Sequence, residues 1–355
     1  MLDTNNPKRG FGSDNHASTH PKIMQALLDC NHGHVPSYGT DDWTLQATAK
    51  FQTVFGKPCD VHFVFNGTAA NVLSLRSGIQ RFETALCSDV AHLHHDECGA
   101  PEFFAGKLAP VKSTSGKLEI EELEKLLVRG GDQHYSQPKM VSITQPTELG
   151  TCYTISEIKK ISDWAKKNKL YLHVDGARLN NSVSYLNTTF KEMLTDTGVD
   201  IISFGGTKNG LMFGEAVVIL NPKLAESFKY IKKQSAQLPS KSRYIAAQFL
   251  AYFENDLYLQ IASHSHKMAQ ELERQLKTLR GPEVQFPVES NAVFVKIHKE
   301  HIKDLKNEKF FYVWDEHTFV CRLMTSWDTK AEDIESFCKS YKKLLDTAES
   351  RPVPR

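Results

Sequence analysis

Residues 201–210 of this chain read IISFGGTKNG, a short apolar run that ends in two glycines and a single lysine, Lys208. The apolar run predicts a strand. Glycines such as Gly205 and Gly206 are useful where the backbone passes close to a bulky group or needs a positive φ. A lysine on an open surface needs no such neighbours. The stretch therefore predicts a strand end that brings a lysine amine close to a ligand.

Similar apolar runs recur through the first two thirds of the chain, between stretches with helical periodicity. Strand and helix in alternation predict right-handed βαβ units, and hence a mostly parallel sheet with helices on both faces. Ligands bind such sheets at the carboxyl ends of the strands. The runs are VHFVF (61–65), ETALCS (83–88), KMVSITQ (139–145), LYLHVD (170–175), DIISF (200–204) and EAVVIL (215–220).

The pattern changes near residue 240, which divides the chain in two. We predict a large α/β domain with an N-terminal arm over residues 1–245, and a small C-terminal α+β domain over residues 246–355. The second part shows long helices over 243–279 and a last helix over 330–347, with the runs AVFVKI (292–297), FFYVW (310–314) and TFVCRLM (318–324) between them.

Two of the predicted helices begin with the Ser/Thr-x-x-Glu spacing of a capping box. Thr154 and Glu157 have this spacing at the start of the helix predicted over 155–167, and Thr329 and Glu332 have it before the last helix. We expect a reciprocal side-chain cap at both places.

The overall composition is typical of a soluble enzyme. The 355 residues include 43 Lys and Arg against 42 Asp and Glu, and a formal net charge of +1 favours neither nucleic acid nor a membrane as a partner. No apolar run approaches the ~18 residues of a membrane span, and the N-terminus lacks the hydrophobic core of a secretory signal. Seven scattered cysteines without a CxxC motif are typical of reduced thiols. We expect a cytoplasmic enzyme.

A second strand end, HVDGAR, carries Asp175. A carboxylate buried alone is costly, so by itself Asp175 also fits a helix N-cap or an ion pair with Arg178. Lys208 ends the following strand, however, and one crossover brings both residues to the same sheet edge. Pyridoxal phosphate needs a carboxylate that keeps its pyridine nitrogen protonated and an amine that forms an imine with its aldehyde. The pair therefore predicts this cofactor.

A third strand end, FNGTAAN (65–71), predicts a site for the cofactor phosphate. Here a helix starts at Thr68, directly after Asn66 and Gly67, and free N–H groups at a helix start bind anions. Taken alone, the motif is also an ordinary turn with an N-cap. Walker and GxGxxG motifs are absent, which disfavours a P-loop or a dinucleotide fold.

The stretch AHLHHDECGAPEFF (91–104) gathers three histidines with acidic residues and a cysteine. A metal-dependent hydrolase is one interpretation, but the HExxH and paired CxxC spacings of zinc sites are missing. We favour no metal. Instead we expect His92 to lie flat over the pyridine ring and to take part in proton transfer.

With these motifs in order, the chain resembles the low-specificity L-threonine aldolases, which are aspartate-aminotransferase-like (fold type I) pyridoxal-phosphate enzymes. The similarity runs from GSDN (12–15) to RLMTSWDT (322–329), and its motifs are YGTDDWT, FNGTAANV, AHLHHDECGAPEFF, QPTELGT, HVDGAR, FGGTKNG and SKSRYIAA. It implies retro-aldol cleavage of L-threonine and L-allo-threonine to glycine and an aldehyde. A β-eliminating lyase, a phenylserine-type aldolase and a hydroxymethyl transfer use the same constellation. A non-catalytic cofactor-binding protein needs neither His92 nor Arg322.

The resemblance also implies a role for each motif residue. Lys208 would bond covalently to the cofactor, and Asp175 would pair with the pyridine nitrogen. Further cofactor contacts are implied for Gly67, Thr68, His92, Arg178 and Thr207. The substrate carboxylate is implied to lie among Ser13, Arg178 and Arg322, and the planar guanidinium of Arg322 suits a carboxylate.

Family members are usually homotetramers with active sites shared between two subunits, which makes Tyr38 and Lys241 candidates for the neighbouring site. Two motifs depart from the family pattern. Well-known members carry a second active-site histidine where this chain has Glu148, and their YGDD motif is longer here, YGTDD (38–42). We predict that His92 and Glu148 share the proton transfer from the substrate β-hydroxyl through water.

Overall fold

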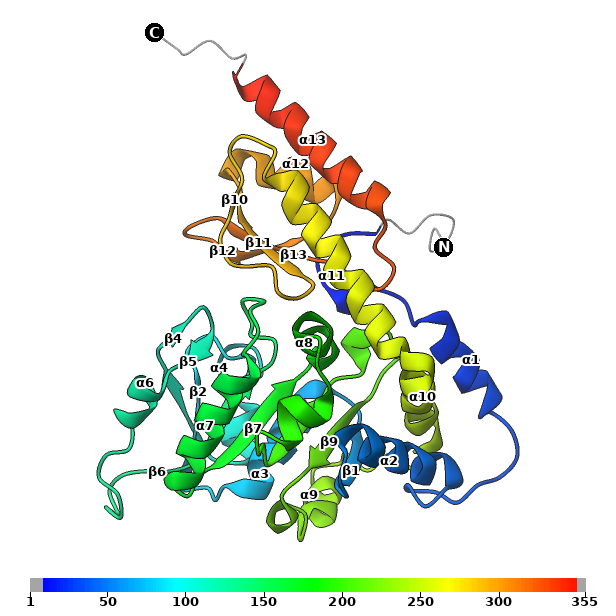
Figure 1. Cartoon of the computed structure of the whole chain (residues 1–355), viewed down its shortest axis with the longest axis vertical. Coiled ribbons are helices and arrows are strands. Elements are labelled where there is room, and N and C mark those ends of the chain that lie inside the picture. The colour runs from blue at the N-terminus through cyan, green and yellow to red at the C-terminus, as the bar shows by residue number, and fades with distance from the viewer. Residues whose placement is uncertain (1–8, 350–355) are drawn as a thin grey trace.

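The computed structural model describes residues 9–349 and contains two main β-sheets. In Figure 1 the larger sheet and its helices form the lower part of the molecule, and the smaller sheet lies above them. The larger sheet has seven strands in the order β1-β9-β8-β7-β6-β2-β3. They are β1 (Asp60–Val64), β2 (Glu83–Ser88), β3 (Lys107–Val111), β6 (Gln137–Thr144), β7 (Tyr171–Gly176), β8 (Ile201–Phe204) and β9 (Glu215–Ile219).

The predicted parallel sheet is confirmed, with one strand reversed. Strands β3, β2, β6, β7 and β8 pair in parallel, whereas β9 runs antiparallel to both β8 and β1. The sequence analysis missed β3, which contains Pro110. Proline has no N–H to donate and is tolerated here because β3 is an edge strand.

Helices cover both faces of this sheet. On one face, α3 (Gly67–Gly78) packs against β7, β8 and β9. On the other, the core takes side chains from α2 (Asp42–Phe55), α7 (Ile155–Lys167), α8 (Leu179–Leu186) and α10 (Arg243–Phe253). The remaining elements around the sheet are η1 (Asp14–His16), α1 (Pro21–Asp29), α4 (His92–His95), α5 (Ala100–Phe104), β4 (Ser113–Thr114), β5 (Lys117–Leu118), α6 (Ile120–Glu124), η2 (Lys191–Thr195), η3 (Thr207–Asn209), η4 (Pro222–Leu224), α9 (Phe228–Gln234) and η5 (Glu254–Asp256).

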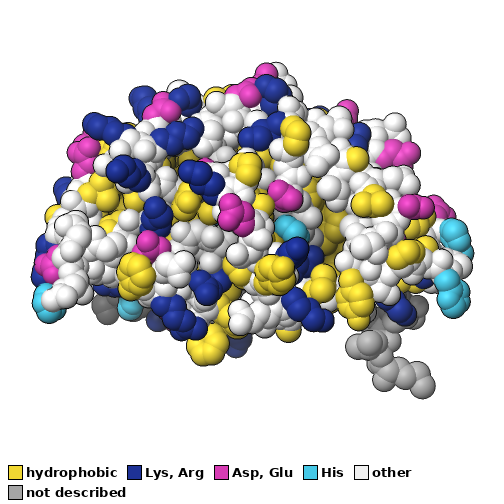
Figure 2. All heavy atoms as spheres, turned by 90° about the horizontal axis from the view of Figure 1, so that it is seen from below, with side chains coloured by type: hydrophobic (Ala, Val, Ile, Leu, Met, Phe, Trp, Pro, Cys, Tyr) yellow, Lys and Arg dark blue, Asp and Glu magenta, His cyan; other side chains and the backbone are white. Residues whose placement is uncertain are grey.

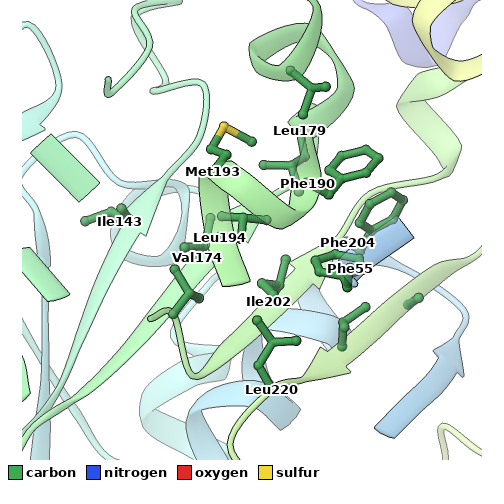
Figure 3. Packing of buried hydrophobic residues seen from close by; sticks show 14 of the residues in the cluster. Phe55, Ile143, Val174, Leu179, Phe190, Met193, Leu194, Ile202, Phe204 and Leu220 are labelled. Atoms are coloured by element: carbon green, nitrogen blue, oxygen red, sulfur yellow. The ribbon is translucent and has the colours of Figure 1, made fainter. Parts of the chain in front are cut away.

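Alternation along the strands decides which polar groups face which helices. Val174, Ile202 and Phe204 belong to the core on the face of α2 and α8, and Figure 3 shows Phe204 beside Phe190. Successive side chains of a strand point to opposite faces. The neighbour of Val174, which is Asp175, therefore lies on the α3 face.

The smaller sheet is antiparallel, in the order β10-β11-β13-β12. Its core includes Phe11 of the N-terminal segment. Phe11 N donates a hydrogen bond to Phe310 O at 2.7 Å, which holds this segment against the small sheet. In Figure 1, α13 lies above this sheet, while α11, which packs against α13, passes beside the sheet and runs down to α10. The predicted division at residues 245/246 stays a prediction. The elements are β10 (Glu283–Val284), β11 (Ala292–Lys296), β12 (Tyr312–Asp315), β13 (Val320–Met324), α11 (Leu257–Leu276), α12 (Lys299–Glu308) and α13 (Ala331–Glu349).

One of the two predicted capping boxes is confirmed. The Thr154 hydroxyl accepts from Glu157 N at 3.2 Å, and Thr154 N donates to the Glu157 carboxylate at 2.6 Å. The second prediction is wrong by one residue, because Lys330 N donates to Asp333 Oδ2 at 3.0 Å. The carboxylate that caps α13 is thus Asp333, which also binds Arg9 and Lys309.

The surface carries charges of both signs. On the face shown in Figure 2, Lys and Arg side chains are interspersed with Asp and Glu. Over residues 9–349, none of the helices combines the length and apolarity that a membrane span requires. In the same part of the chain, no group of three or more His, Cys, Asp or Glu side chains is arranged to hold a metal ion.

Candidate functional site

A cavity of 1080 Å³ opens at the carboxyl ends of β6, β7 and β8, on the side that faces the small sheet. It brings together the predicted site residues with two exceptions, Tyr38 and Lys241. The predicted residues that line it are Ser13, Gly67, Thr68, His92, Glu148, Asp175, Arg178, Thr207, Lys208 and Arg322.

The two glycines before Lys208 are needed for contacts within the chain itself. A Cβ on Gly205 would lie 2.2 Å from the Ala177 carbonyl oxygen, and one on Gly206 would lie 2.4 Å from the Gly214 carbonyl oxygen. Any larger residue would force the backbones apart. The glycines thus let the turn η3, which carries Lys208, lie against the end of β7 and the start of β9.

The environment of Lys208 favours a neutral amine. Coulombic repulsion from Arg178 lowers the pKa of Lys208, and burial lowers it further. The buried carboxylate of Glu215 accepts a hydrogen bond from Gly206 N, two residues before Lys208. Burial raises the pKa of Glu215 to about 7. A neutral amine at the end of a cavity is a nucleophile that can attack a carbonyl carbon.

Asp175 is 3% exposed and is held from two directions. Its Oδ1 accepts from Ala177 N at 3.0 Å, and its Oδ2 accepts from Asn71 Nδ2 at 2.8 Å. Asn71 comes from α3, on the face that strand alternation assigns to Asp175. The ion pair with Arg178, one of the alternatives from the sequence, does not form, because Arg178 binds Asp14 instead.

A hydrogen-bonded chain continues from Asn71 to the histidine cluster. Asn71 Nδ2 also donates to Glu97 Oε1 at 2.8 Å, and Glu97 Oε1 lies 2.9 Å from His92 Nδ1. Glu97 is 4% exposed, and its Oε2 is buried without a partner. The hydrogen bond to Glu97 raises the pKa of His92, against the effect of burial. His95 binds the Asp89 carbonyl instead, so the cluster does not converge on a metal.

Glu148 lies next to His92. Its Oε1 accepts from His92 N at 3.0 Å and from the Thr144 hydroxyl at 2.7 Å. Its Oε2 is buried and has no partner. Burial raises the pKa of Glu148 to about 6. A carboxyl group with a free oxygen and a pKa near neutrality can take up or release a proton.

Two arginines lie toward the small sheet. Arg322 of β13 lies between the rings of Tyr312 and Trp314, with Cζ 6.0 and 5.3 Å from their centroids. Its Nε is buried without a partner, and burial lowers its pKa to about 10. Arg178 gives Nε and Nη2 to Asp14, which also accepts from Asn291 Nδ2 at 3.1 Å. Of these two arginines, Arg178 is paired with a carboxylate of the protein and Arg322 is not.

The start of α3 is open to the cavity. Asn66 caps the helix by accepting from Ala69 N at 2.9 Å. A Cβ on Gly67 would meet no atom within 4 Å, which leaves room beside the Gly67 and Thr68 backbone. The N–H groups of such a first turn, together with the helix dipole, attract an anion.

Tyr38 and Lys241 lie together on the surface, outside this cavity. Tyr38 N donates to Ser240 O at 2.9 Å, and the Tyr38 side chain is 55% exposed. Lys241 is also exposed. Neither residue therefore lines the cavity of its own chain.

Sequence reasoning missed the residues that hold the predicted ones in place. Asn71 belongs to the motif FNGTAAN, and Glu97 belongs to the motif AHLHHDECGAPEFF. Asn71 stands one helical turn after Gly67, and this spacing could have placed it on the same face of the helix. Asp14 stood beside Ser13 in GSDN. Glu215 and Asn291 carried no signal in the sequence.

Comparisons with known proteins agree with this geometry. A family model described as Beta-eliminating lyase matches residues 10–300. A low specificity L-threonine aldolase from Pseudomonas sp. is 39% identical over 94% of this chain and 97% of its own length. The solved threonine aldolase of Leishmania major, 30% identical, covers 95% of this chain and 100% of its own, with a TM-score of 0.90. An aspartate aminotransferase from Rhodobacter sphaeroides shares the fold at 15% identity, with a TM-score of 0.69 over 99% and 96% of the two chains.

Proposed function

Since this chain belongs to the low-specificity L-threonine aldolases of the beta-eliminating lyase family, we propose that it cleaves the Cα–Cβ bond of L-threonine and L-allo-threonine. The products are glycine and an aldehyde. The fold is that of the fold type I pyridoxal-phosphate enzymes, and the enzyme is a carbon–carbon lyase that uses this cofactor. The observation that carries the proposal is the convergence of Lys208, Asp175 and the open start of α3 in one cavity.

The residues present fit pyridoxal phosphate. We assign Lys208 to the aldehyde carbon, Asp175 to the pyridine nitrogen, and the Gly67 and Thr68 N–H groups to the phosphate. The free space at Gly67 and the buried Asp175 carboxylate support these assignments. Further contacts are assigned to His92, Arg178 and Thr207. When bound, pyridoxal phosphate supplies a protonated ring that accepts the electron pair released as the Cα–Cβ bond breaks.

Asp175 acts by keeping the positive charge on the ring nitrogen. Each pKa unit by which a carboxylate favours the protonated ring is worth about 1.4 kcal/mol. Asn71 and Ala177 hold both Asp175 oxygens, so the carboxylate does not have to reorganise during the reaction.

Arg322 has the task of fixing the substrate carboxylate, with Ser13 and Arg178 beside it. The bond to be broken must stand perpendicular to the ring plane, and a fixed carboxylate sets that rotation. The unpartnered Arg322 Nε supports this role, because a buried donor without an acceptor is costly in the ligand-free chain. Arg178 already has a carboxylate partner and contributes mainly positive charge.

The proton of the β-hydroxyl is taken up by His92 and Glu148, directly or through one water molecule. Support comes from the free Glu148 Oε2 and from the hydrogen bond that joins the two residues at His92 N. Glu148 replaces a histidine of the family pattern. General acid–base assistance of this kind is worth about 10²–10⁴-fold in rate.

The assembly is proposed to be a cytoplasmic homotetramer in which Tyr38 and Lys241 complete the site of a neighbouring subunit. Support comes from the exposed side chain of Tyr38 and from the backbone hydrogen bond of Tyr38 to Ser240, which places Tyr38 and Lys241 on one surface that a second subunit can contact. In the cell the reaction degrades threonine and forms glycine.

Product analysis tests this function against the alternatives. Purified enzyme with L-threonine or L-allo-threonine should release acetaldehyde and glycine in equal amounts, and a chelator should leave the rate unchanged. A β-eliminating lyase would give ammonia and a keto acid instead, and a non-catalytic protein would give neither. L-Phenylserine in place of threonine measures how freely the site accepts a larger aldehyde.

A further inference from the structure

A continuous hydrogen-bonded chain joins the proposed base to the proposed partner of the cofactor ring. It runs from His92 Nδ1 to Glu97 Oε1 at 2.9 Å, from there to Asn71 Nδ2 at 2.8 Å, and on to Asp175 Oδ2 at 2.8 Å. Three of its members, Asn71, Glu97 and Asp175, are less than 5% exposed. Its four members come from four separate places: α4 (His92), the α4–α5 turn (Glu97), α3 (Asn71) and β7 (Asp175).

Donor and acceptor counting restricts where the protons of this chain can lie. The amide nitrogen of Asn71 has two hydrogens, and it gives one to Glu97 Oε1 and one to Asp175 Oδ2. Glu97 Oε1 therefore accepts from Asn71, and when it carries no proton of its own it also accepts from His92. A neutral His92 must then donate from Nδ1, which leaves Nε2 as its basic nitrogen.

We propose that Glu97 sets the tautomer and the basicity of His92, and that Asn71 locks this pair to Asp175. The proposed base and the proposed partner of the ring nitrogen then form one preorganised unit. Glu97 is a positioning residue, since its contact is to His92 rather than to substrate. The inference rests on the proposed function and extends it to residues for which the sequence assigned no role.

The charges around His92 give the direction of the effect. Glu97 faces it from the α4–α5 turn, Asp175 from β7, Lys208 from η3, and Glu148 from the loop after β6. The bond to Glu97 raises the pKa of His92 most, while burial and Lys208 lower it. Loss of the Glu97 charge should therefore lower the pKa of His92 and make it a weaker base.

A purely structural role for Glu97 is the competing explanation. Glu97 O accepts from Ala100 N at 2.9 Å, and the following residues, Cys98 and Gly99, have positive φ values. The side chain could simply hold this tight turn together. A useful test must therefore measure the protonation of His92 and not only the rate.

The first measurement is the pH profile of kcat/KM for L-allo-threonine in three variants. Glu97→Gln keeps an acceptor oxygen but loses the charge, and Glu97→Ala loses both. We expect a loss of about 10-fold for Glu97→Gln and about 100-fold for Glu97→Ala, within the range of acid–base assistance. In Glu97→Gln the acid limb of the profile should move to lower pH, because His92 stays unprotonated further down. The control is Glu102→Gln, an exposed glutamate in neighbouring α5, which should behave as wild type.

The second measurement reads the tautomer without relying on turnover. In ¹⁵N spectra of histidine-labelled holoenzyme, the His92 signal is identified by its absence in His92→Asn. It should show the Nδ1–H form in wild type and Glu97→Gln, and a mixture of tautomers in Glu97→Ala. If wild type releases no aldehyde while these spectra behave as stated, the proposed function fails and the Glu97–His92 coupling stands.

The two explanations differ most clearly in the His92→Asn background. Because Glu97 acts through His92, Glu97→Gln should cause no further loss of kcat there. A structural role predicts the same loss in both backgrounds, with an unmoved acid limb. Either of those results, or an unchanged tautomer in Glu97→Ala, would overturn the proposal.

Discussion

Asp14 and Arg178 form a buried two-point ion pair across 164 residues of sequence, with Nε–Oδ2 at 2.6 Å and Nη2–Oδ1 at 2.9 Å. Burial by itself would raise the pKa of Asp14, but the charge and hydrogen bonds of Arg178 hold it below its usual value. The pair attaches the N-terminal segment to the turn after β7, at the edge of the cavity. It also fixes the orientation of the Arg178 guanidinium.

Removal of Asp14 should therefore affect both stability and substrate binding. Asp14→Ala leaves a buried guanidinium unpaired, so the free energy of unfolding should fall by about 3 kcal/mol. KM for L-threonine should rise with it. Urea denaturation and initial rates measure the two effects. Asp163→Ala removes the carboxylate of an exposed ion pair with Lys159 and should cost less than about 1 kcal/mol; equal losses in both variants would contradict a special role for the buried pair.

Lys208 should carry the covalent bond to the cofactor. The purified protein should be yellow, and borohydride should bleach the colour and label the peptide that contains Lys208. Lys208→Ala should yield no labelled peptide and no measurable turnover, because none of the other lysines in residues 9–349 lines this cavity. Lys160→Ala, on the exposed side of α7, serves as the control. If Lys208→Ala kept an imine to the protein that borohydride reduces, the lysine would be wrongly assigned.

Arg322 should act mainly on the substrate carboxylate. A hydrogen bond to a charged group is worth about 1.5–3 kcal/mol, so Arg322→Gln should raise KM about 10- to 100-fold. Arg322→Lys keeps the charge but loses the planar fork, and it should recover only part of this loss. Arg274→Lys tests the same exchange at an exposed ion pair with Glu271 and should leave KM unchanged. A KM near the wild-type value in Arg322→Gln would exclude the contact.

His92 and Glu148 should both lower kcat when changed, while the cofactor absorbance persists. His92→Asn should cost about 10²-fold or more, and Glu148→Gln less, because the carboxyl acts beside the imidazole. Glu148 accepts protons only when ionised, so activity should fall as the pH drops through about 6, and Glu148→Gln should lack this step. If both variants keep nearly full retro-aldol rates, another group takes the proton.

Glu148 should also destabilise the fold above neutral pH. Burial raises its pKa from 4.5 to about 6, so the folded chain prefers the protonated form, and stability is lost as the pH rises from about 4.5 through about 6. Glu148→Gln should then increase the free energy of unfolding by about 2 kcal/mol at pH 8, with no gain at pH values below the unfolded pKa. Denaturation curves of Glu148→Gln and of the control Glu102→Gln, at pH 8 and at a pH below the unfolded pKa, measure the change in the free energy of unfolding.

Shared active sites can be tested by mixing inactive variants. In the proposed shared site, Lys208 comes from one subunit and Tyr38 from its neighbour. A hybrid dimer of Tyr38→Ala and Lys208→Ala therefore has one site with both defects and one intact site. After subunit exchange at equal amounts, about a quarter of the wild-type activity should return, as expected for random pairing. Lys208→Ala mixed with Asp175→Asn should regain none, because both residues come from the same chain. No recovery in the first mixture would contradict the proposed contribution of Tyr38.

Several features could be predicted from the sequence because each depends on local pattern. Asp175 and Lys208 end apolar runs, and parallel strands bring their carboxyl ends to one sheet edge. Asn66 and Thr154 cap their helices as their spacing indicates. The edge strand β3 was missed because Lys107 and Pro110 interrupt its apolar pattern.

By itself, the sequence determined the mostly parallel sheet, the cofactor, and the side chains that we propose for its chemistry, because strand periodicity and strand-end residues are properties of short segments. The tertiary structure alone decided their partners. Asn71 meets Asp175, and Asp14 meets Arg178, only because of how α3 and the N-terminal segment are placed against the sheet. Such contacts depend on the rotation and distance of packed elements, which spacing along a chain does not encode. For the same reason the two glycines at residues 205 and 206, which predicted a close approach to a ligand, accommodate the backbone of the protein itself.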